Sequence, residues 1–449
     1  MNSDGPRLDN KAAEYSDVLA FLLCLATLIV LLGAEFLGGM SVIVIVVALA
    51  LAALVWQRPQ EAPGAAMLYL FGCNVFFPSS ARFDATQSTI QMYYWAAGLL
   101  VITLAAIMRL GLLRVSSVPW SARAFLVVAF AAALYGRAHG AATSYVIRQF
   151  YGAVLLVAYM GISFHVGNLS LLVRRISTYG VLCALAFYAY FAVEFAERGF
   201  HREMTTVGSQ AAMMAVILLI FGLEHRKVTW LIGSVALILV PSLIFQRRDV
   251  LTFLLALPLT LAVTVRSKGL RFLCYGIVAF LLLPGFLPPV AQWVGEAIQN
   301  TPYIGKVLPE GAADSDTLLE RDIQLGAAVE TVQTHPVLGA GLGGDIEWLS
   351  PVDGLYDGAY VDNGWAYLLQ KMGLLGVLAF LWFSITLARN FSRELLAPSI
   401  CLVCVLLMTM FSEPIFFHFT TAPFAGSFAG LIFALSDRKV YSSMAAIQA

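Results

Sequence analysis

Long apolar runs separated by short polar connectors recur along almost the whole chain. An α-helix needs about 20 mostly apolar residues to cross roughly 30 Å of hydrocarbon, and a bilayer offers no water to exposed backbone groups, so such runs fold as helices. The pattern predicts an all-α polytopic membrane protein with about 14 transmembrane helices, near residues 18–33, 40–56, 64–78, 89–108, 120–135, 150–166, 176–195, 207–222, 228–245, 250–265, 271–289, 362–387, 396–411 and 421–435.

One segment interrupts this pattern. Residues 291–361 are largely polar and contain no apolar run long enough to cross a bilayer. The preceding residues 1–290 are expected to form an N-terminal bundle of about 11 helices, and residues 362–449 a C-terminal group of about three. The chain is therefore predicted to be a helical bundle that carries one large loop, with short helices of its own, outside the bilayer.

Composition and charge set the environment and the orientation. Hydrophobic residues make up 60% of the chain and charged residues 12%, which excludes an ordinary soluble protein. By the positive-inside tendency, the side that holds most basic connectors is cytoplasmic, and the 291–361 loop then lies outside. The connectors on the cytoplasmic side contain Arg58, Arg109, Arg114, Arg174, Arg175, Arg226, Lys227, Arg266, Lys268, Arg271, Arg389, Arg393, Arg438 and Lys439.

The basic residues predicted on the outer side are nearly all arginine. A guanidinium offers paired donors that match phosphate oxygens, so the set favours a polyanionic ligand at the outer leaflet, although each arginine alone could equally anchor the chain at headgroups. Three adjacent charges at 247–249 interrupt an apolar run and are costly there unless they face a polar cavity or each other. The full set of basic residues predicted on the outer side is Arg82, Arg137, Arg148, Arg198, Arg202, Arg247, Arg248, Lys306 and Arg321.

The outer loop carries its own helix signals. Thr317 and Glu320 fit a capping box, apolar residues recur at Leu319, Ile323 and Ala327, and His335-Pro336 ends the helix. Arg321 then lies in the first turn, as a phosphate ligand or as a solvated partner of nearby acids.

Two further features of the loop have alternative interpretations. His335 is either a helix cap or a substrate ligand. The glycine-rich turn after it, which includes Gly341, either turns the chain or brings backbone close to a substrate.

Asp362 and Asn363 open the helix that follows the loop. Asp at this place is a good helix N-cap, but it also puts a carboxylate at the membrane surface, where a general base would be needed. The pair Asp314 and Asp316 is more typical of a solvated helix start than of a metal site, and the sequence predicts no metal.

In the last apolar run, Gly426 and Gly430 have the spacing of a small-residue packing motif and predict close helix contact within the chain.

With these motifs in order, residues from about Leu239 to Leu381 resemble the O-antigen ligase and polysaccharide polymerase family of bacterial envelopes (Wzy/WaaL type). The similarity lies in the charged break at Arg247-Arg248, in Glu320-Arg321, in the His335-Pro-Val-Leu-Gly-Ala-Gly-Leu-Gly segment, and in the Asp362-Asn363 pair that leads into Gly-Leu-Leu-Gly376. Two positions depart from the family pattern: the break is usually Ser-Arg-Gly, and the pair is usually His-Asn, so that Asp362 stands in place of the expected histidine.

The resemblance implies a bacterial inner-membrane glycosyltransferase whose site faces the periplasm. Its donor would be an oligosaccharide on a polyprenyl diphosphate, its acceptor a growing polysaccharide, and its further partners chain-length and export proteins, with no cofactor and no nucleic acid. Catalytic roles fall on Arg247, Arg248, Arg321 and Asp362, and substrate binding on Arg148, Arg202, His335, Gly341 and Asn363. A polymerase of repeat units is favoured over a ligase that moves finished glycan to lipid A core or protein, and over a flippase.

Overall fold

The computed structural model describes residues 40–76, 85–111, 118–166, 169–198, 205–243, 257–259, 261–262, 268–286, 312–350, 354–358, 364–389 and 420–434. This part of the chain is almost entirely helical. Within it, five helices are long and apolar enough to cross a membrane: Tyr93–Leu110, Trp120–Ala138, Thr143–Val166, Leu171–Ala189 and Gly364–Leu387. The protein is therefore a helical membrane protein, as the apolar pattern predicts. The predicted helices near 18–33 and 396–411, and most of the one near 250–265, lie outside the described residues.

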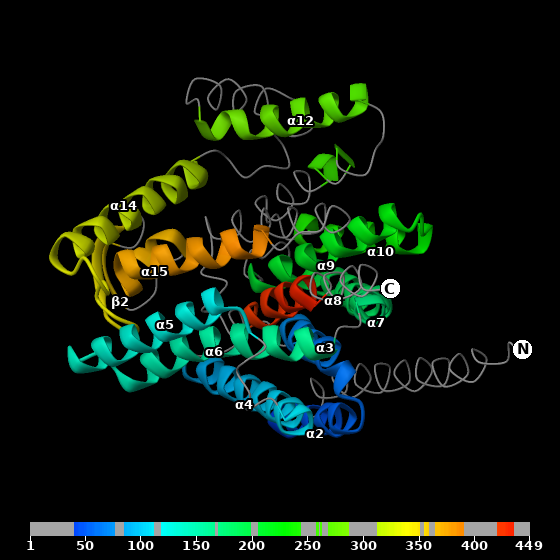
Figure 1. Ribbon diagram of the computed structural model, residues 1–449, viewed down its shortest axis with the longest axis horizontal. Helices are drawn as coiled ribbons and strands as arrows, with labels where there is room; N and C mark the ends of the chain where they lie inside the picture. The colour runs from blue at the N-terminus through cyan, green and yellow to red at the C-terminus, as the bar shows by residue number, and fades with distance from the viewer. Residues whose placement is uncertain are drawn as a thin grey trace, which may run out of the picture. The chain divides into compact units, whose positions relative to one another are not determined.

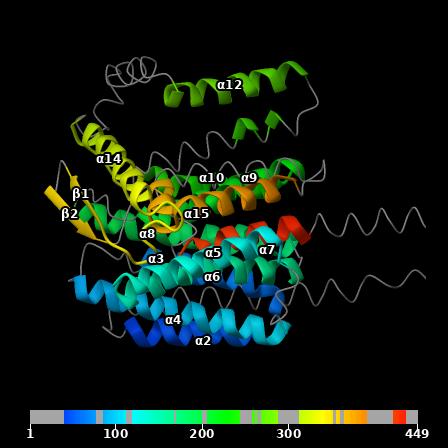
Figure 2. The ribbon, with the colours of Figure 1, turned by 60° about the vertical axis from the view of Figure 1, so that its left-hand side comes forward.

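The chain forms two compact units. Unit 1 contains residues 1–113, 168–218 and 227–246, and unit 2 contains residues 114–167, 219–226 and 247–449. Unit 1 is built from α2 (Met40–Gln57), the short helix η1 (Pro59–Glu61), α3 (Ala62–Phe76), α4 (Ala85–Leu110), α7 (Leu169–Arg175), the π-helical turn η3 (Ile176–Gly180), α8 (Val181–Arg198), most of α9 (Thr205–Glu224) and α10 (Val228–Leu243). Helices α2 and α4 lie side by side in it (Figures 1 and 2).

An ion pair joins distant parts of unit 1. The Arg175 guanidinium donates two hydrogen bonds to the Glu61 carboxylate, at 2.8 and 2.5 Å, and each residue is only 4% exposed. The same guanidinium lies 5.5 Å from the centre of the Tyr179 ring. Because the pair is bidentate and shielded from water, it fixes η1 against the end of α7.

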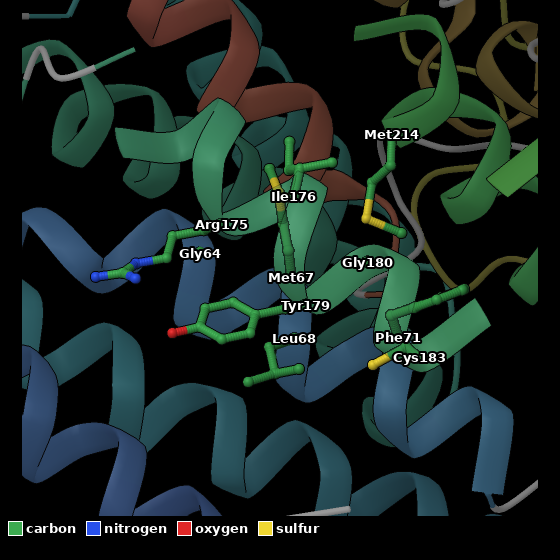
Figure 3. A pocket seen from close by; sticks show the side chains of 10 residues that line it. All are labelled: Gly64, Met67, Leu68, Phe71, Arg175, Ile176, Tyr179, Gly180, Cys183 and Met214. Carbon is green, nitrogen blue, oxygen red and sulfur yellow. The ribbon is translucent and has the colours of Figure 1, made fainter. Parts of the chain in front are cut away.

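A narrow cleft lies next to this ion pair (Figure 3). Its walls are mostly apolar and come from α3, η3, α8 and α9, with Met67, Phe71, Ile176, Cys183 and Met214 among them. The cleft has room for about one water molecule. It is therefore a gap in helix packing and is too small to be a substrate site.

Unit 2 contains the polar segment 291–361 and helices that pack on its described part. It comprises α5 (Trp120–Ala138), α6 (Thr143–Val166), α12 (Lys268–Phe286), α14 (Ala312–Thr334), β1 (Ile346–Ser350), β2 (Gly354–Gly358), α15 (Gly364–Arg389) and the helix Ala422–Ala434. Helix α15 packs against α5 and α14, and α6 packs against α5 (Figures 1 and 2). Residues more than 150 positions apart therefore share one packed unit.

The helix Ala422–Ala434 packs directly on α6. A Cβ atom added to Gly426 would collide with the Leu156 carbonyl, and one added to Gly430 would collide with the Met160 carbonyl. The two glycines therefore let two helix backbones approach closely. This confirms the predicted packing motif.

The loop differs from its prediction in two ways. Helix α14 begins at Ala312, so Thr317 lies inside the helix and not at its cap, whereas the helix ends at Thr334, as predicted from His335-Pro336. From residue 323 onward, where the side chains of α14 are described, the buried positions are Gln324 and Ala328, each one residue beyond Ile323 and Ala327 of the predicted apolar face. The last segment of the loop is an antiparallel hairpin with β1 paired to β2, from Ile346 opposite Gly358 to Ser350 opposite Gly354, so the all-α class needs this one addition.

Candidate functional site

The glycine-rich turn after α14 is docked onto three helices of unit 2. The Ala340 N–H donates to the Gln370 carbonyl of α15 at 2.7 Å, and the Leu342 N–H donates to the Ala132 carbonyl of α5 at 2.9 Å. The Gly343 N–H donates to the buried Gln149 side chain of α6 at 2.5 Å. The turn is therefore anchored by hydrogen bonds to all three helices.

Glycine is required in this turn by both its backbone conformation and its contacts. Gly339, Gly341 and Gly343 have φ values of 61°, 81° and 77°, which side-chain-bearing residues rarely adopt. An added Cβ would meet the Gln370 carbonyl at Gly339, the Gly136 backbone at Gly341, and Val146 at Gly343. The turn thus does more than reverse the chain, because it brings backbone against backbone at three helices.

Helix α15 is broken where the turn meets it. Gly373 has φ 59° and ψ −157° inside the helix. The turn supplies acceptors to the interrupted backbone: the Leu374 N–H donates to the Pro336 carbonyl at 3.0 Å and the Leu375 N–H to the Val337 carbonyl at 3.3 Å. Irregular backbone in a membrane helix is tolerated only where other parts of the protein satisfy it. The turn and the break are therefore one interlocked structure.

The backbone donors of the turn are all used by the protein. Every N–H from Gly339 to Gly344 donates to a carbonyl or to Gln149. A phosphate cradle would need several free N–H groups directed at the ligand. Gly341 in particular donates to the Leu338 carbonyl and packs on Gly136, so its backbone docks the turn on α5.

Polar side chains are buried beside the break. The Lys371 ammonium donates to the Gly344 carbonyl and lies 5.9 Å from the centre of the Tyr367 ring. Lys371 and Gln370 are both fully buried, and within the described part of the chain the Gln370 side-chain amide makes no hydrogen bond. A buried cation in a membrane helix is expensive and marks a functional region by default.

Three rings gather at the exposed end of α5. The Tyr135 hydroxyl lies 3.1 Å from Nδ1 of His335, and the Tyr135 and His139 rings are 4.0 Å apart between centroids. His139 follows the last residue of α5 in a glycine-terminated cap, because the Ala141 N–H donates to the Gly136 carbonyl and Gly140 has φ 95°. His335 lies directly after α14, so the cluster links the ends of two helices.

The structure brings part of the predicted site together. His335 and Gly341 lie in the turn, and Arg148 adjoins Gln149, which binds the turn. Arg321 belongs to α14, which packs on α15, but its side chain is outside the described set. Asp362 and Asn363 directly precede α15 and lie outside the described residues, as do Arg202, Arg247 and Arg248.

Two residues that hold this structure together were difficult to identify from the sequence. Gln149 is a single amide in an apolar helix, and its function depends on a turn nearly 200 residues away. Lys371 lies well inside the predicted transmembrane helix 362–387, and a basic residue at that place is the signal that the sequence offers. No protein-family model matches the chain, and no curated protein matches it.

Proposed function

We propose that the protein is a glycosyltransferase that joins polyprenyl-diphosphate-linked oligosaccharide repeat units into a surface polysaccharide or exopolysaccharide, working on the periplasmic side of the bacterial inner membrane. One observation carries this proposal. The turn gathers the start of α6, the end of α5, the end of α14 and the first half of α15 at one end of unit 2. Of the residues expected to act in the reaction, Arg148 belongs to α6, Arg321 belongs to α14, and Asp362 precedes α15 in the sequence.

The chemistry suits the residue types. The bond from sugar to diphosphate is already activated, so the donor needs no nucleotide, and cations in a partly dry site stabilise the charge that grows on the leaving diphosphate. Arg321 with Arg247 or Arg248 would hold that diphosphate, and Arg148 would add a further guanidinium at the turn. Asp362 would take the proton from the attacking acceptor hydroxyl, which displaces the diphosphate with inversion.

The single asymmetric loop favours an enzyme over a transporter. Many transporters contain two related halves, with their site near the middle of the membrane. Here the outer segment between α12 and α15 forms a helix, a hairpin and a docked turn, and the sequence contains no internal repeat. A polymerase is favoured over a ligase because the His-Asn pair of the resembled family is Asp362-Asn363 here.

The test is the length profile of surface polysaccharide in cells that carry Arg321→Ala or Asp362→Ala at normal membrane abundance. For a polymerase, long polymer disappears while single repeat units accumulate on lipid in the outer leaflet of the inner membrane. Full-length polymer that accumulates without its acceptor would instead identify a ligase, and repeat units held on the inner leaflet would identify a flippase. An unchanged profile in both variants would contradict the assigned residues.

A further inference from the structure

Both imidazoles of the ring cluster are oriented by one residue, Tyr135. Nδ1 of His139 lies 2.8 Å from the Tyr135 carbonyl, which only accepts, so this nitrogen carries the proton. Nδ1 of His335 lies 3.1 Å from the hydroxyl of the same tyrosine. Within the described part of the chain, neither Nε2 atom makes a hydrogen bond. Each ring is thus held at one nitrogen, and the other is available.

The geometry points to a binding site for a divalent transition metal ion, with Nε2 of His139 and Nε2 of His335 as its ligands. Histidines that bind metal usually donate their second ring N–H to a backbone carbonyl or another oxygen, which fixes the tautomer and the ring orientation. His139 has that arrangement, and His335 has it when its Nδ1–H donates to the Tyr135 oxygen. Neutral imidazole suits Zn²⁺, Ni²⁺ and Cu²⁺.

The ring separation is compatible with this proposal. The two imidazole centroids are 6.3 Å apart. With metal–nitrogen bonds of about 2.0–2.1 Å, two rings on one ion have centroids on the order of 5 to 6 Å apart. Both side chains are exposed, so a shift of about 1 Å or less would need only small rotations of their torsion angles.

The site would have two protein ligands and water in its remaining positions. The described residues contain no group of three or more His, Cys, Asp or Glu side chains that could hold a metal ion. Affinity is therefore expected to be modest, and imidazole selects Zn²⁺, Ni²⁺ or Cu²⁺ over Mg²⁺ or Ca²⁺. Such an ion would join the end of α5 to the end of α14, beside the docked turn.

The experiment uses the full-length protein in detergent, purified without a histidine tag. Zn²⁺ binding is measured by competition with a chromophoric chelator, and Cu²⁺ is used as a spectroscopic probe because pulsed electron paramagnetic resonance counts coordinated imidazoles. The expected result is one Zn²⁺ per chain and a Cu²⁺ spectrum with two imidazoles. His139→Ala and His335→Ala should each weaken Zn²⁺ binding tenfold or more, and Mg²⁺ should not compete.

His165 supplies a matched control. Its Nδ1 lies 3.0 Å from the Gly161 carbonyl four residues earlier, the same arrangement as in His139, but no second imidazole is recorded beside it among the described residues. His165→Ala should leave Zn²⁺ binding unchanged. Should His335→Ala fail to fold, His335→Gln keeps a hydrogen-bonding side chain of similar size and should show the same loss.

The outcomes separate clearly. Zn²⁺ should raise the melting temperatures of the wild type and His165→Ala but not those of His139→Ala and His335→Ala. Wild-type affinity no better than that of His139→Ala, or a Cu²⁺ spectrum with a single imidazole, would overturn the site. A loss in His165→Ala equal to that in His139→Ala would show non-specific surface binding and would overturn it as well. None of these results depends on the proposed glycosyltransferase activity.

Discussion

The two units bury charge in different ways. In unit 1, Arg175 is buried against Glu61, a side chain of opposite charge, in a bidentate pair. In unit 2, Lys371 is buried with its ammonium on the Gly344 carbonyl, and the exposed Asp345 is near enough to interact electrostatically. In unit 1 the charge of Arg175 is therefore neutralised by a buried carboxylate, whereas in unit 2 the Lys371 ammonium holds the backbone of the glycine-rich turn at Gly344.

The two arrangements also differ in how completely their buried polar groups are satisfied. In unit 1 the charges of Arg175 and Glu61 neutralise each other through two hydrogen bonds. The cleft beside them has room for only about one water molecule. In unit 2, where the glycine-rich turn meets the break in α15, the buried side-chain amide of Gln370 makes no hydrogen bond within the described part of the chain. Polar groups of this kind within membrane helices are typical of functional regions.

The largest effect on stability is expected at the ion pair of unit 1. Arg175→Met leaves the Glu61 carboxylate buried without its partner and should lower the free energy of unfolding by about 3–5 kcal/mol. The measurement is denaturant unfolding in detergent micelles. The double variant Glu61→Leu with Arg175→Met should recover most of that loss, because it leaves no buried charge. A double variant no more stable than Arg175→Met would contradict this explanation.

The next largest effect is expected in the turn of unit 2. Gly339→Ala adds a Cβ at φ 61°, directed at the Gln370 carbonyl, and strain together with overpacking should cost about 2–4 kcal/mol. Gly326→Ala in α14 is the control, since its added Cβ would meet nothing within 4 Å. That change should be neutral or stabilise by up to about 1 kcal/mol. Equal melting temperatures for the two variants would contradict the close packing of the glycine-rich turn on α15.

Replacement of the lysine in unit 2 should have a smaller effect than replacement of the arginine in unit 1. Lys371→Met removes a charge and leaves only a backbone carbonyl without its donor, so the loss should be about 1–2 kcal/mol. The same unfolding measurement applies. A loss as large as that of Arg175→Met would mean that Lys371 is paired with a buried carboxylate, and the contrast between the units would disappear.

The smallest effect is expected at the exposed end of α5 in unit 2. Tyr135→Phe removes the hydroxyl that lies beside His335 and should cost about 0.5–1.5 kcal/mol in the free energy of unfolding. Its ring stack with His139 remains. A loss above about 3 kcal/mol would show that the hydroxyl has a larger structural function than one exposed hydrogen bond.

Local patterns in the sequence predicted several of the described helices but not how the glycine-rich turn docks on them. Apolar run lengths predicted α5 and α15 closely, His335-Pro336 marked the end of α14, and Gly426 and Gly430 marked a helix contact. The predicted start of α14 was wrong, because the helix begins at Ala312, before the capping pattern at Thr317.

The hairpin and the docked turn could not be predicted from sequence. Strands β1 and β2 pair, but their sequences show no strong alternation of apolar and polar residues. The Gln149 contact and the break at Gly373 depend on partners far away in the chain. A glycine at φ 59° inside a helix is only stable once the turn satisfies the interrupted backbone.

The central claim is that glycan transfer takes place at the end of unit 2 where the turn is docked. The most direct measurement is transfer by purified protein in liposomes that contain the lipid-linked repeat unit, extracted from cells that lack this chain, with Arg148→Ala compared with Arg174→Ala on α7. Wild type and Arg174→Ala should release polyprenyl diphosphate and build polymer at the same rate, while Arg148→Ala should be slower by about tenfold or more. Equal rates for the two variants, or no polymer from the wild type, would contradict the account.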